Sequence, residues 1–174
     1  MPEPKLTPPT PESSRPNIPY DLLDGSEGIG LFPWSRLSEQ MLAAHTYWIG
    51  TTRSDGRPHV MPVWGVWLDE TFYFSTGPTT VNGRNLAANP ALVVHLDSGE
   101  DVIVLEGVAE EITEPALVGR INDVYGPKYQ WDERMTSFNA LRPRVAFAWL
   151  CRGGGPASES DFKGNATRWR FRED

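Results

Sequence analysis

The chain has little cysteine and no long apolar run, and both absences limit what it can be. One cysteine among 174 residues excludes an internal disulfide and fits a reducing cytosol. No stretch approaches the ~20 apolar residues of a membrane helix, and the Pro-rich first thirty residues do not resemble a signal peptide. A net charge of −7 without any basic run argues against nucleic-acid binding. We therefore expect a cytoplasmic protein that binds neither membrane nor nucleic acid.

The residue patterns of hydrolytic and metal-dependent sites are also missing. None of the three histidines, His45, His59 and His95, has the spacing of a metal-binding motif. We interpret them as surface or structural residues, with substrate contact by His59 as the less favoured alternative. Ser75 lacks the Gly-x-Ser-x-Gly elbow of a hydrolase. Cys151 follows an apolar run, which favours a buried structural thiol over a nucleophile.

The sequence does contain a dense run of strand and turn signals between residues 47 and 90. An Asp-Gly pair at 55–56 predicts a hairpin between strands 47–53 and 59–68. A turn at 69–70 leads into strand 71–75. Hydroxyls at 79–80 can cap a helix over 81–88, and Asn-Pro at 89–90 ends it. The N–H groups at the start of such a helix would suit a phosphate.

The rest of the chain predicts more strands and two more helices. We expect strands at 91–97, 101–112, 145–150 and 167–171, and apolar spacing predicts helices at 36–44 and 114–125. Ser35 and Thr113 are the expected caps, and Gly126-Pro127 is expected to break the second helix. The stretches after 128 and 152 are expected to be irregular. Residues 31–174 then form one mainly β domain, a six- to seven-stranded antiparallel barrel or sandwich. Residues 1–30 are a Pro-rich arm, either disordered or wrapped around a partner subunit.

The central stretch resembles the pyridoxamine 5'-phosphate oxidase-like superfamily of flavin and deazaflavin oxidoreductases. The resemblance rests on four motifs and extends more weakly as far as Trp169: Asp55-Gly56-Arg57-Pro58-His59, Pro62-Val63-Trp64, Phe72-Tyr73-Phe74-Ser75-Thr76-Gly77 and Arg84-Asn85-Leu86. It implies an FMN-binding split β-barrel that forms a homodimer, with deazaflavin coenzyme F-420 or FMN bound between the subunits. It also implies an oxidoreductase that transfers a hydride to a small conjugated molecule.

The resemblance also implies which residues hold the cofactor. Residues along the ring would be Met61, Pro62, Val63 and Trp64, and those beneath it Ser75, Thr76 and Gly77. The phosphate would lie against Thr80, Asn82, Arg84 and Asn85. Five residues are candidates to complete the site from the partner chain: Lys128, Tyr129, Trp131, Arg168 and Trp169.

One departure from the family pattern concerns the phosphate. Relatives commonly carry Ser-Arg-Lys before the Arg-Asn-Leu triplet, whereas this chain has Asn82 at the lysine position. Gly83 would weaken the helix by ~1 kcal/mol relative to alanine. The alternative interpretation of these residues is barrel packing, helix capping and surface packing. The alternative function is a redox-inactive barrel that binds or sequesters a small ligand, with a heme-type ligand less favoured.

Overall fold

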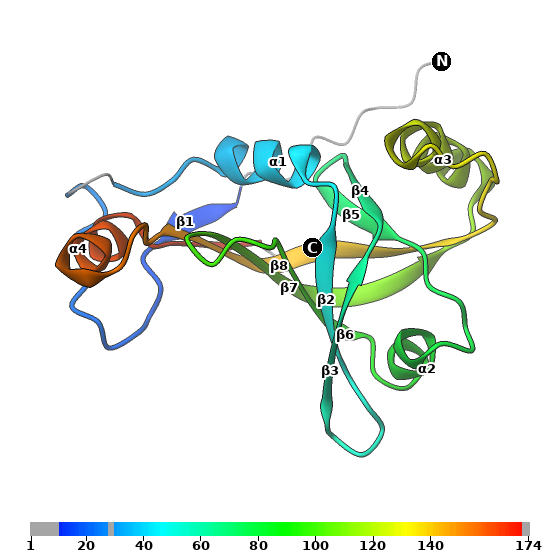
Figure 1. The fold of residues 1–174 in the computed structure, drawn as a ribbon, viewed down its shortest axis with the longest axis horizontal. Coiled ribbons are helices and arrows are strands. Elements are labelled where there is room, and N and C mark those ends of the chain that lie inside the picture. The colour runs from blue at the N-terminus through cyan, green and yellow to red at the C-terminus, as the bar shows by residue number, and fades with distance from the viewer. Residues whose placement is uncertain (1–10, 28–29, 172–174) are drawn as a thin grey trace.

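The computed structural model describes residues 11–27 and 30–171, which form one antiparallel sheet with four helices on its flanks (Figure 1). The strand order is β1-β9-β8-β7-β6-β2-β3, and β5 pairs with both β4 and β8. The strands are β1 Glu12–Ser14, β2 Tyr47–Thr52, β3 Pro58–Val63, β4 Gly65–Leu68, β5 Thr71–Phe74, β6 Ala91–His95, β7 Asp101–Ile112, β8 Phe138–Leu150 and β9 Thr167–Arg170. The helices are α1 Trp34–Ala43, α2 Val81–Ala88, α3 Pro115–Tyr129 and α4 Gly155–Asn165.

The long strands β7 and β8 form the spine of the sheet. The first part of β8 pairs with β5 and the second part with β9. Between these parts the β7–β8 register shifts at Glu106/Gly107, and Pro143 lies at this bulge. A bulge bends a strand and tolerates a residue that has no N–H to donate. One strand can therefore serve both halves of the fold.

The sheet does not close into a complete barrel, because β3 runs into β4 while the two strands keep different partners. β3 pairs with β2, and β4 pairs with β5. Gly65 begins β4 at this corner. A Cβ atom there would lie 2.4 Å from the Phe72 ring and 2.7 Å from the Tyr73 carbonyl oxygen. Only glycine fits without repacking, so this residue type fixes the place where the chain changes partners.

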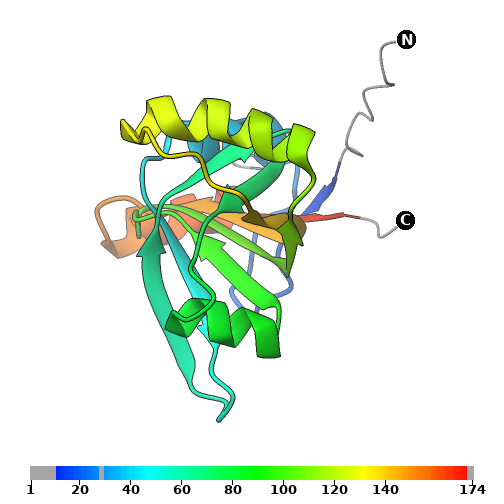
Figure 2. The ribbon, with the colours of Figure 1, turned by 90° about the vertical axis from the view of Figure 1, so that its right-hand side faces the viewer.

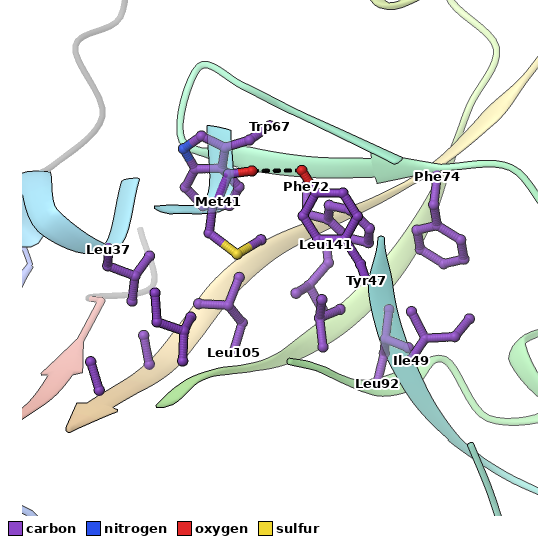
Figure 3. Close-up of a cluster of buried hydrophobic side chains, with 14 of the residues drawn as sticks. Leu37, Met41, Tyr47, Ile49, Trp67, Phe72, Phe74, Leu92, Leu105 and Leu141 are labelled. Carbon is purple, nitrogen blue, oxygen red and sulfur yellow. Dashed lines mark hydrogen bonds between the residues drawn. The ribbon is translucent and has the colours of Figure 1, made fainter. Parts of the chain in front are cut away.

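Two hydrophobic clusters fill the space between sheet and helices. Leu37 and Met41, one turn apart on α1, lie over the main cluster with Leu105 of β7 (Figure 3). Burying each such side chain contributes roughly 1.5–3 kcal/mol. The second cluster lies beneath α3 and includes Val66, Val118, Ile121, Tyr125 and Phe138. Within the described ranges, no helix has the length and apolar character needed to cross a membrane.

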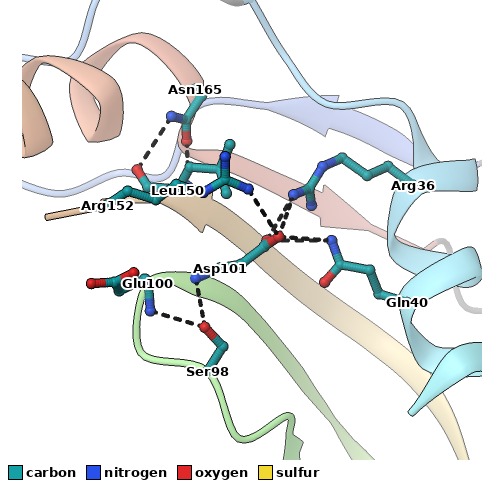
Figure 4. A network of polar contacts seen from close by, with 8 residues as sticks. All are labelled: Arg36, Gln40, Ser98, Glu100, Asp101, Leu150, Arg152 and Asn165. Carbon is teal, nitrogen blue, oxygen red and sulfur yellow. Dashed lines mark hydrogen bonds and ion pairs between the residues drawn. The ribbon is translucent and has the colours of Figure 1, made fainter.

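Two carboxylates, Asp101 and Glu70, hold α1 by polar contacts. The Arg36 guanidinium donates to both oxygens of Asp101 at 2.7 and 2.8 Å, and Gln40 donates to the same carboxylate (Figure 4). Arg152 lies 3.9 Å from Asp101, so the β8–α4 loop joins this network. The carboxylate of Glu70, in the β4–β5 turn, accepts hydrogen bonds from Trp34 and Ser38.

The structure confirms the predicted fold class and most of its elements. Helix 81–88 and strand 101–112 have the predicted bounds, and the Asp-Gly hairpin forms. The sheet has nine strands instead of six or seven for two reasons. Trp64 divides the predicted strand 59–68 into β3 and β4, and residues 12–14 add β1.

Other predictions about the helices and β8 are wrong. Helix α1 begins at Trp34, so Ser35 lies inside it and does not cap it. The cap of α3 is Glu114, whose carboxylate accepts from two backbone N–H groups, and not Thr113. Helix α3 continues through Gly126-Pro127 to Tyr129. Strand β8 begins at Phe138, seven residues before the predicted start at residue 145. Helix α4 was not predicted.

The described part of the N-terminal arm packs on the chain's own sheet. Strand β1 pairs with β9, and Arg15 follows it directly. The Arg15 guanidinium donates to five backbone carbonyls, three in the arm and two at the end of α4: Leu23, Asp24, Glu27, Gly164 and Ala166. One side chain thus ties the arm to the last turn of α4. A role of the arm in wrapping a partner stays a prediction.

We expect Arg15→Ala to destabilise the fold by about 1–3 kcal/mol, because carbonyls that share one charged donor lose it together. Thermal unfolding would show a lower melting temperature. The control is Arg57→Ala at the exposed hairpin tip, where Arg57 pairs only with its neighbour Asp55 among the residues described. Equal melting temperatures for the two variants would contradict the anchoring role of Arg15.

Candidate functional site

The loop from β5 into α2 presents unused hydrogen-bond donors. Thr80 is the N-cap: its hydroxyl accepts from the Gly83 N–H at 3.0 Å, donates to the Gly77 carbonyl at 2.7 Å, and lies 2.9 Å from the Thr76 hydroxyl. The backbone N–H groups of Val81 and Asn82 have no acceptor in the part of the chain that the structure describes. Free N–H groups at a helix start carry partial positive charge and suit an anion.

Gly83 is required at this helix start. A Cβ atom on Gly83 would lie 2.2 Å from the Gly77 carbonyl oxygen and 2.9 Å from Pro78 Cα. The loop therefore crosses α2 at van der Waals distance only because residue 83 has no side chain. Glycine lowers the stability of the helix itself, but here it allows the loop that carries Thr76 and Gly77 to pack closely against α2.

The two asparagines of α2 face the barrel. Asn85 Nδ2 donates to the Thr51 hydroxyl at 2.9 Å, and that hydroxyl donates to Asn82 Oδ1 at 3.2 Å. Asn82 is 8% exposed and Asn85 6%. Their contact with β2 explains why asparagine stands at position 82, since lysine has no acceptor for the Thr51 hydroxyl. Arg84 is exposed, and its guanidinium donates to the Thr79 carbonyl.

The β2–β3 hairpin projects from the body of the molecule, and α2 lies beside it (Figure 2). Its residues Met61, Pro62 and Trp64 are exposed, with exposed fractions of 45% for Met61 and 43% for Trp64. Met61 pairs with Ile49, so its side chain lies on the same face of the hairpin as Thr51 and α2. Val63 is half-buried against the main core.

The end of α3 bridges the open side of the barrel. Lys128 Nζ donates to the Tyr47 hydroxyl on β2 and to the Gly65 carbonyl on β4, both at 2.9 Å. The Tyr129 hydroxyl accepts from the Gly65 N–H at 2.9 Å and has two carbonyls, His45 and Gly65, within 2.7 Å for its single proton. Side chains here replace the strand-to-strand hydrogen bonds that a closed barrel would have.

Burial shifts the ionisation of this group of residues. It raises the pKa of Tyr47, raises that of Tyr129 to about 12, and lowers the pKa of Lys128 to about 8. Because unfolding returns the Lys128 pKa to its ordinary value near 10.5, the unfolded chain holds this proton more tightly. The contribution of Lys128 to stability therefore increases as pH rises from about 8 towards 10.5.

At the end of α3 the structure brings together four further predicted site residues, and it places two others on β9. The Trp64 ring stacks on Tyr129 at 4.7 Å and meets Trp131 edge-on at 6.1 Å, so Trp64 lies together with Lys128, Tyr129 and Trp131 within one chain. Whether Lys128, Tyr129 and Trp131 also reach a partner's site stays a prediction. Arg168 lies on β9, where its guanidinium donates to the Ser14 hydroxyl. Trp169 is 1% exposed in the main core, so it is not accessible to a ligand without repacking.

The remaining candidates have local partners. His59 Nδ1 lies 3.2 Å from Arg53, and His95 stacks on Trp48. Cys151 is half-buried, with its Sγ 3.2 Å from the Gly99 carbonyl, so the thiol is not buried as predicted. Among the residues placed here, no group of His, Cys, Asp or Glu could hold a metal ion. Sequence reasoning missed Tyr47, Thr51 and Gly65, because their roles depend on contacts distant in the chain.

An antiparallel barrel left open on one side, with a short helix beside its projecting hairpin, defines a split β-barrel. A family model described as pyridoxamine 5'-phosphate oxidase matches residues 35–150. The chain belongs to this family. No curated protein sequence matches it.

Solved structures share the fold at low sequence identity. Conserved hypothetical protein Rv2991 from Mycobacterium tuberculosis is 18% identical with a TM-score of 0.62, over 79% of this chain and 96% of that one. The FAD binding protein from Mycobacterium smegmatis is 16% identical with a TM-score of 0.50, over 80% and 98%. General Stress Protein 26 from Bacillus anthracis is 21% identical with a TM-score of 0.51, over 65% and 93%.

We expect Tyr129→Phe to lower the free energy of unfolding by about 1–3 kcal/mol, because the Gly65 N–H loses its side-chain acceptor. Chemical denaturation would measure the change. Tyr125→Phe is the matched control, since Tyr125 packs on the Tyr129 ring at 4.8 Å and its hydroxyl has no hydrogen-bond partner within the described chain. A larger loss in Tyr125→Phe than in Tyr129→Phe would refute the bridging role.

Proposed function

We propose that the chain is a flavin- or deazaflavin-dependent oxidoreductase that acts as a homodimer and transfers a hydride to a small conjugated substrate. The observation that carries the proposal is the position of α2. Its free N–H donors lie on the same face of the β2–β3 hairpin as the exposed side chain of Met61. A nucleotide-like coenzyme needs both features, an anion site for its tail and an apolar wall for its ring.

The residues present fit such a coenzyme, but with a modest anion site. Val81 and Asn82 offer N–H groups, and the exposed Thr79 offers a hydroxyl, whereas the Thr80 hydroxyl already donates to the Gly77 carbonyl. Arg84 would have to turn from the Thr79 carbonyl to reach a phosphate. When bound, the ring would supply the hydride chemistry. The chain would hold the tail at α2, orient the ring along Met61 and Trp64, and exclude water.

An apolar outer sheet face supports the homodimer. Cross-strand partners share a face of the sheet. The row Ile49, Val94, Leu105 and Ala146 faces the core, so the adjacent residues of these strands face outward. Six of the outward residues are apolar and none of them is fully buried: Trp48, Val60, Val93, Val104, Val145 and Phe147. His95 and the exposed Glu106 lie on the same face. A face of this kind is suited to a second subunit.

Light scattering should give twice the 19.4 kDa mass of one chain at micromolar concentration. Val60→Glu, on the outer face and 49% exposed, should weaken the dimer about tenfold or more, because association would bury an unpaired charge. The control is Val124→Glu on α3, where Val124 is 36% exposed. A monomeric parent protein, or equal dissociation of both variants, would rule out this interface.

The coenzyme proposal is tested by comparing FMN with riboflavin, which has the same ring without phosphate. We expect FMN to bind about tenfold more tightly at low salt, because a phosphate adds charge-assisted hydrogen bonds at α2. Arg84→Ala should reduce this preference and Arg57→Ala should not. Fluorescence quenching of both ligands measures it, with a parallel titration of the deazaflavin coenzyme. Equal binding of FMN and riboflavin would place the anion site elsewhere.

The alternative is a redox-inactive barrel that binds or sequesters a small ligand. The burial of Asn82 against Thr51 favours it, because the position that is basic in relatives has no charge here. This alternative predicts that no flavin or deazaflavin binds, while the protein still forms a dimer. Titrations with neither coenzyme binding would favour it over the oxidoreductase.

A further inference from the structure

Lys128 carries a positive charge that has no carboxylate partner among the described residues. Its two hydrogen-bond acceptors are the Tyr47 hydroxyl and the Gly65 carbonyl, and both are neutral. Its ammonium also lies 4.8 Å from the Tyr47 ring and 5.4 Å from the Tyr129 ring. Across the residues placed by the structure, no carboxylate lies within ion-pair distance of Lys128.

Bridging the open side of the barrel does not require this charge. A neutral amine has two N–H donors, which are enough for the Tyr47 and Gly65 acceptors. The charged form must instead lose part of its hydration on burial, and this cost lowers the pKa of Lys128 to about 8. At pH 7 the charge therefore persists at a cost, and the third N–H of the ammonium has no hydrogen-bond acceptor among the described residues. An approaching anion would recover that cost.

The surroundings of Lys128 favour an organic anion over an inorganic one. Trp64 is 43% exposed and is joined through its own backbone to Gly65, whose carbonyl accepts from Lys128. Trp131 is 39% exposed and meets the Trp64 ring. Flat aromatic surfaces stack on planar conjugated groups. A groove next to Trp131 is lined by the carboxylates of Asp123, Asp132 and Glu133 and by Arg134, which pairs with Asp123 at 3.0 Å. Because Arg134 is already paired, Lys128 is the cation near these rings that has no carboxylate partner among the described residues.

We propose that Lys128 and the neighbouring Trp64 form a binding site for a small aromatic carboxylate. Lys128 binds the carboxylate, and the exposed indole packs against the ring. A small aromatic carboxylate would be the substrate class of the proposed oxidoreductase. The inference depends on that proposed function only where the bound molecule is called a substrate. Binding itself requires neither a coenzyme nor turnover.

Groups that face Lys128 from other elements must be separated in the test. They are Tyr47 on β2, Tyr125 and Tyr129 on α3, and His45 before β2, whose ring lies 4.9 Å from Tyr129. Burial raises the pKa of each of these tyrosines above the ordinary value, so they stay neutral while Lys128 loses its proton. His45→Gln removes the remaining ionisable ring without touching Lys128.

The experiment compares benzoate with benzamide, its neutral analogue, by isothermal titration calorimetry on the coenzyme-free protein. At pH 7 and low salt we expect benzoate to bind about tenfold or more tightly than benzamide, as a charge-assisted hydrogen bond provides. The preference should disappear in Lys128→Met and as pH rises well above 8. It should persist in His45→Gln and in Lys163→Met, a control for general charge on α4.

Equal binding of the two ligands by the parent protein, no binding of either, or a benzoate preference retained in Lys128→Met would overturn the proposal. If Lys128→Met does not fold, NMR titration of the parent protein decides instead. Benzoate must then raise the Lys128 pKa, and an unchanged pKa refutes the site. FMN titrations are run separately. If FMN does not bind, the comparison of benzoate with benzamide still tests the Lys128 site.

Discussion

The fold depends on how the backbone of Gly65 is satisfied. At this residue the chain leaves the β2–β3 pair and joins β5, so one side of the barrel has no strand-to-strand hydrogen bonds. The Tyr129 hydroxyl and the Lys128 ammonium, both from the last turn of α3, bind the Gly65 peptide groups. Glycine is required because Phe72 and Tyr73 fill the space of a Cβ atom. The corner at Gly65, the last turn of α3 and the open side of the barrel therefore depend on one another structurally.

This arrangement also explains why the exposed apolar residues gather where they do. Because β3 is not continued by β4 in the same ladder, the β2–β3 hairpin projects from the body (Figure 1). Successive residues of a strand point to opposite faces, so Val60 and Met61 lie on opposite faces of this hairpin. Met61 faces the side where α2 packs, and Val60 faces the outer sheet surface. A closed barrel would have buried or paired this strand. Leaving the barrel open therefore creates two surfaces, one suited to a ligand and one to a second subunit.

The sequence predicted correctly those elements that are determined by the residues of their own turns and caps. The Asp69-Glu70 turn forms with both residues in the left-handed region, and Thr80 caps α2 as its hydroxyl suggested. Elements fixed by distant contacts were not predictable. Helix α3 passes Gly126-Pro127 because Lys128 and Tyr129 have partners more than sixty residues away. The start of β8 is concealed by Pro143, and α4 has no apolar stripe that would reveal it.

The candidate site shows the same division. The family resemblance indicates that Asn82 stands where relatives commonly have a basic residue, but only the structure shows that its amide oxygen accepts from Thr51 beneath the helix. A lysine at this position would restore charge near the anion site while removing the acceptor and placing an amine at a nearly buried position, so the two effects oppose each other. Val81, the first residue of α2, is half-buried and bears no side-chain hydrogen bond that would be lost. A basic residue there would oppose the helix dipole by ~0.3–1 kcal/mol, less than one charge-assisted bond to phosphate provides. Position 81 is therefore where the chain could regain a basic residue without losing the packing of α2 on β2.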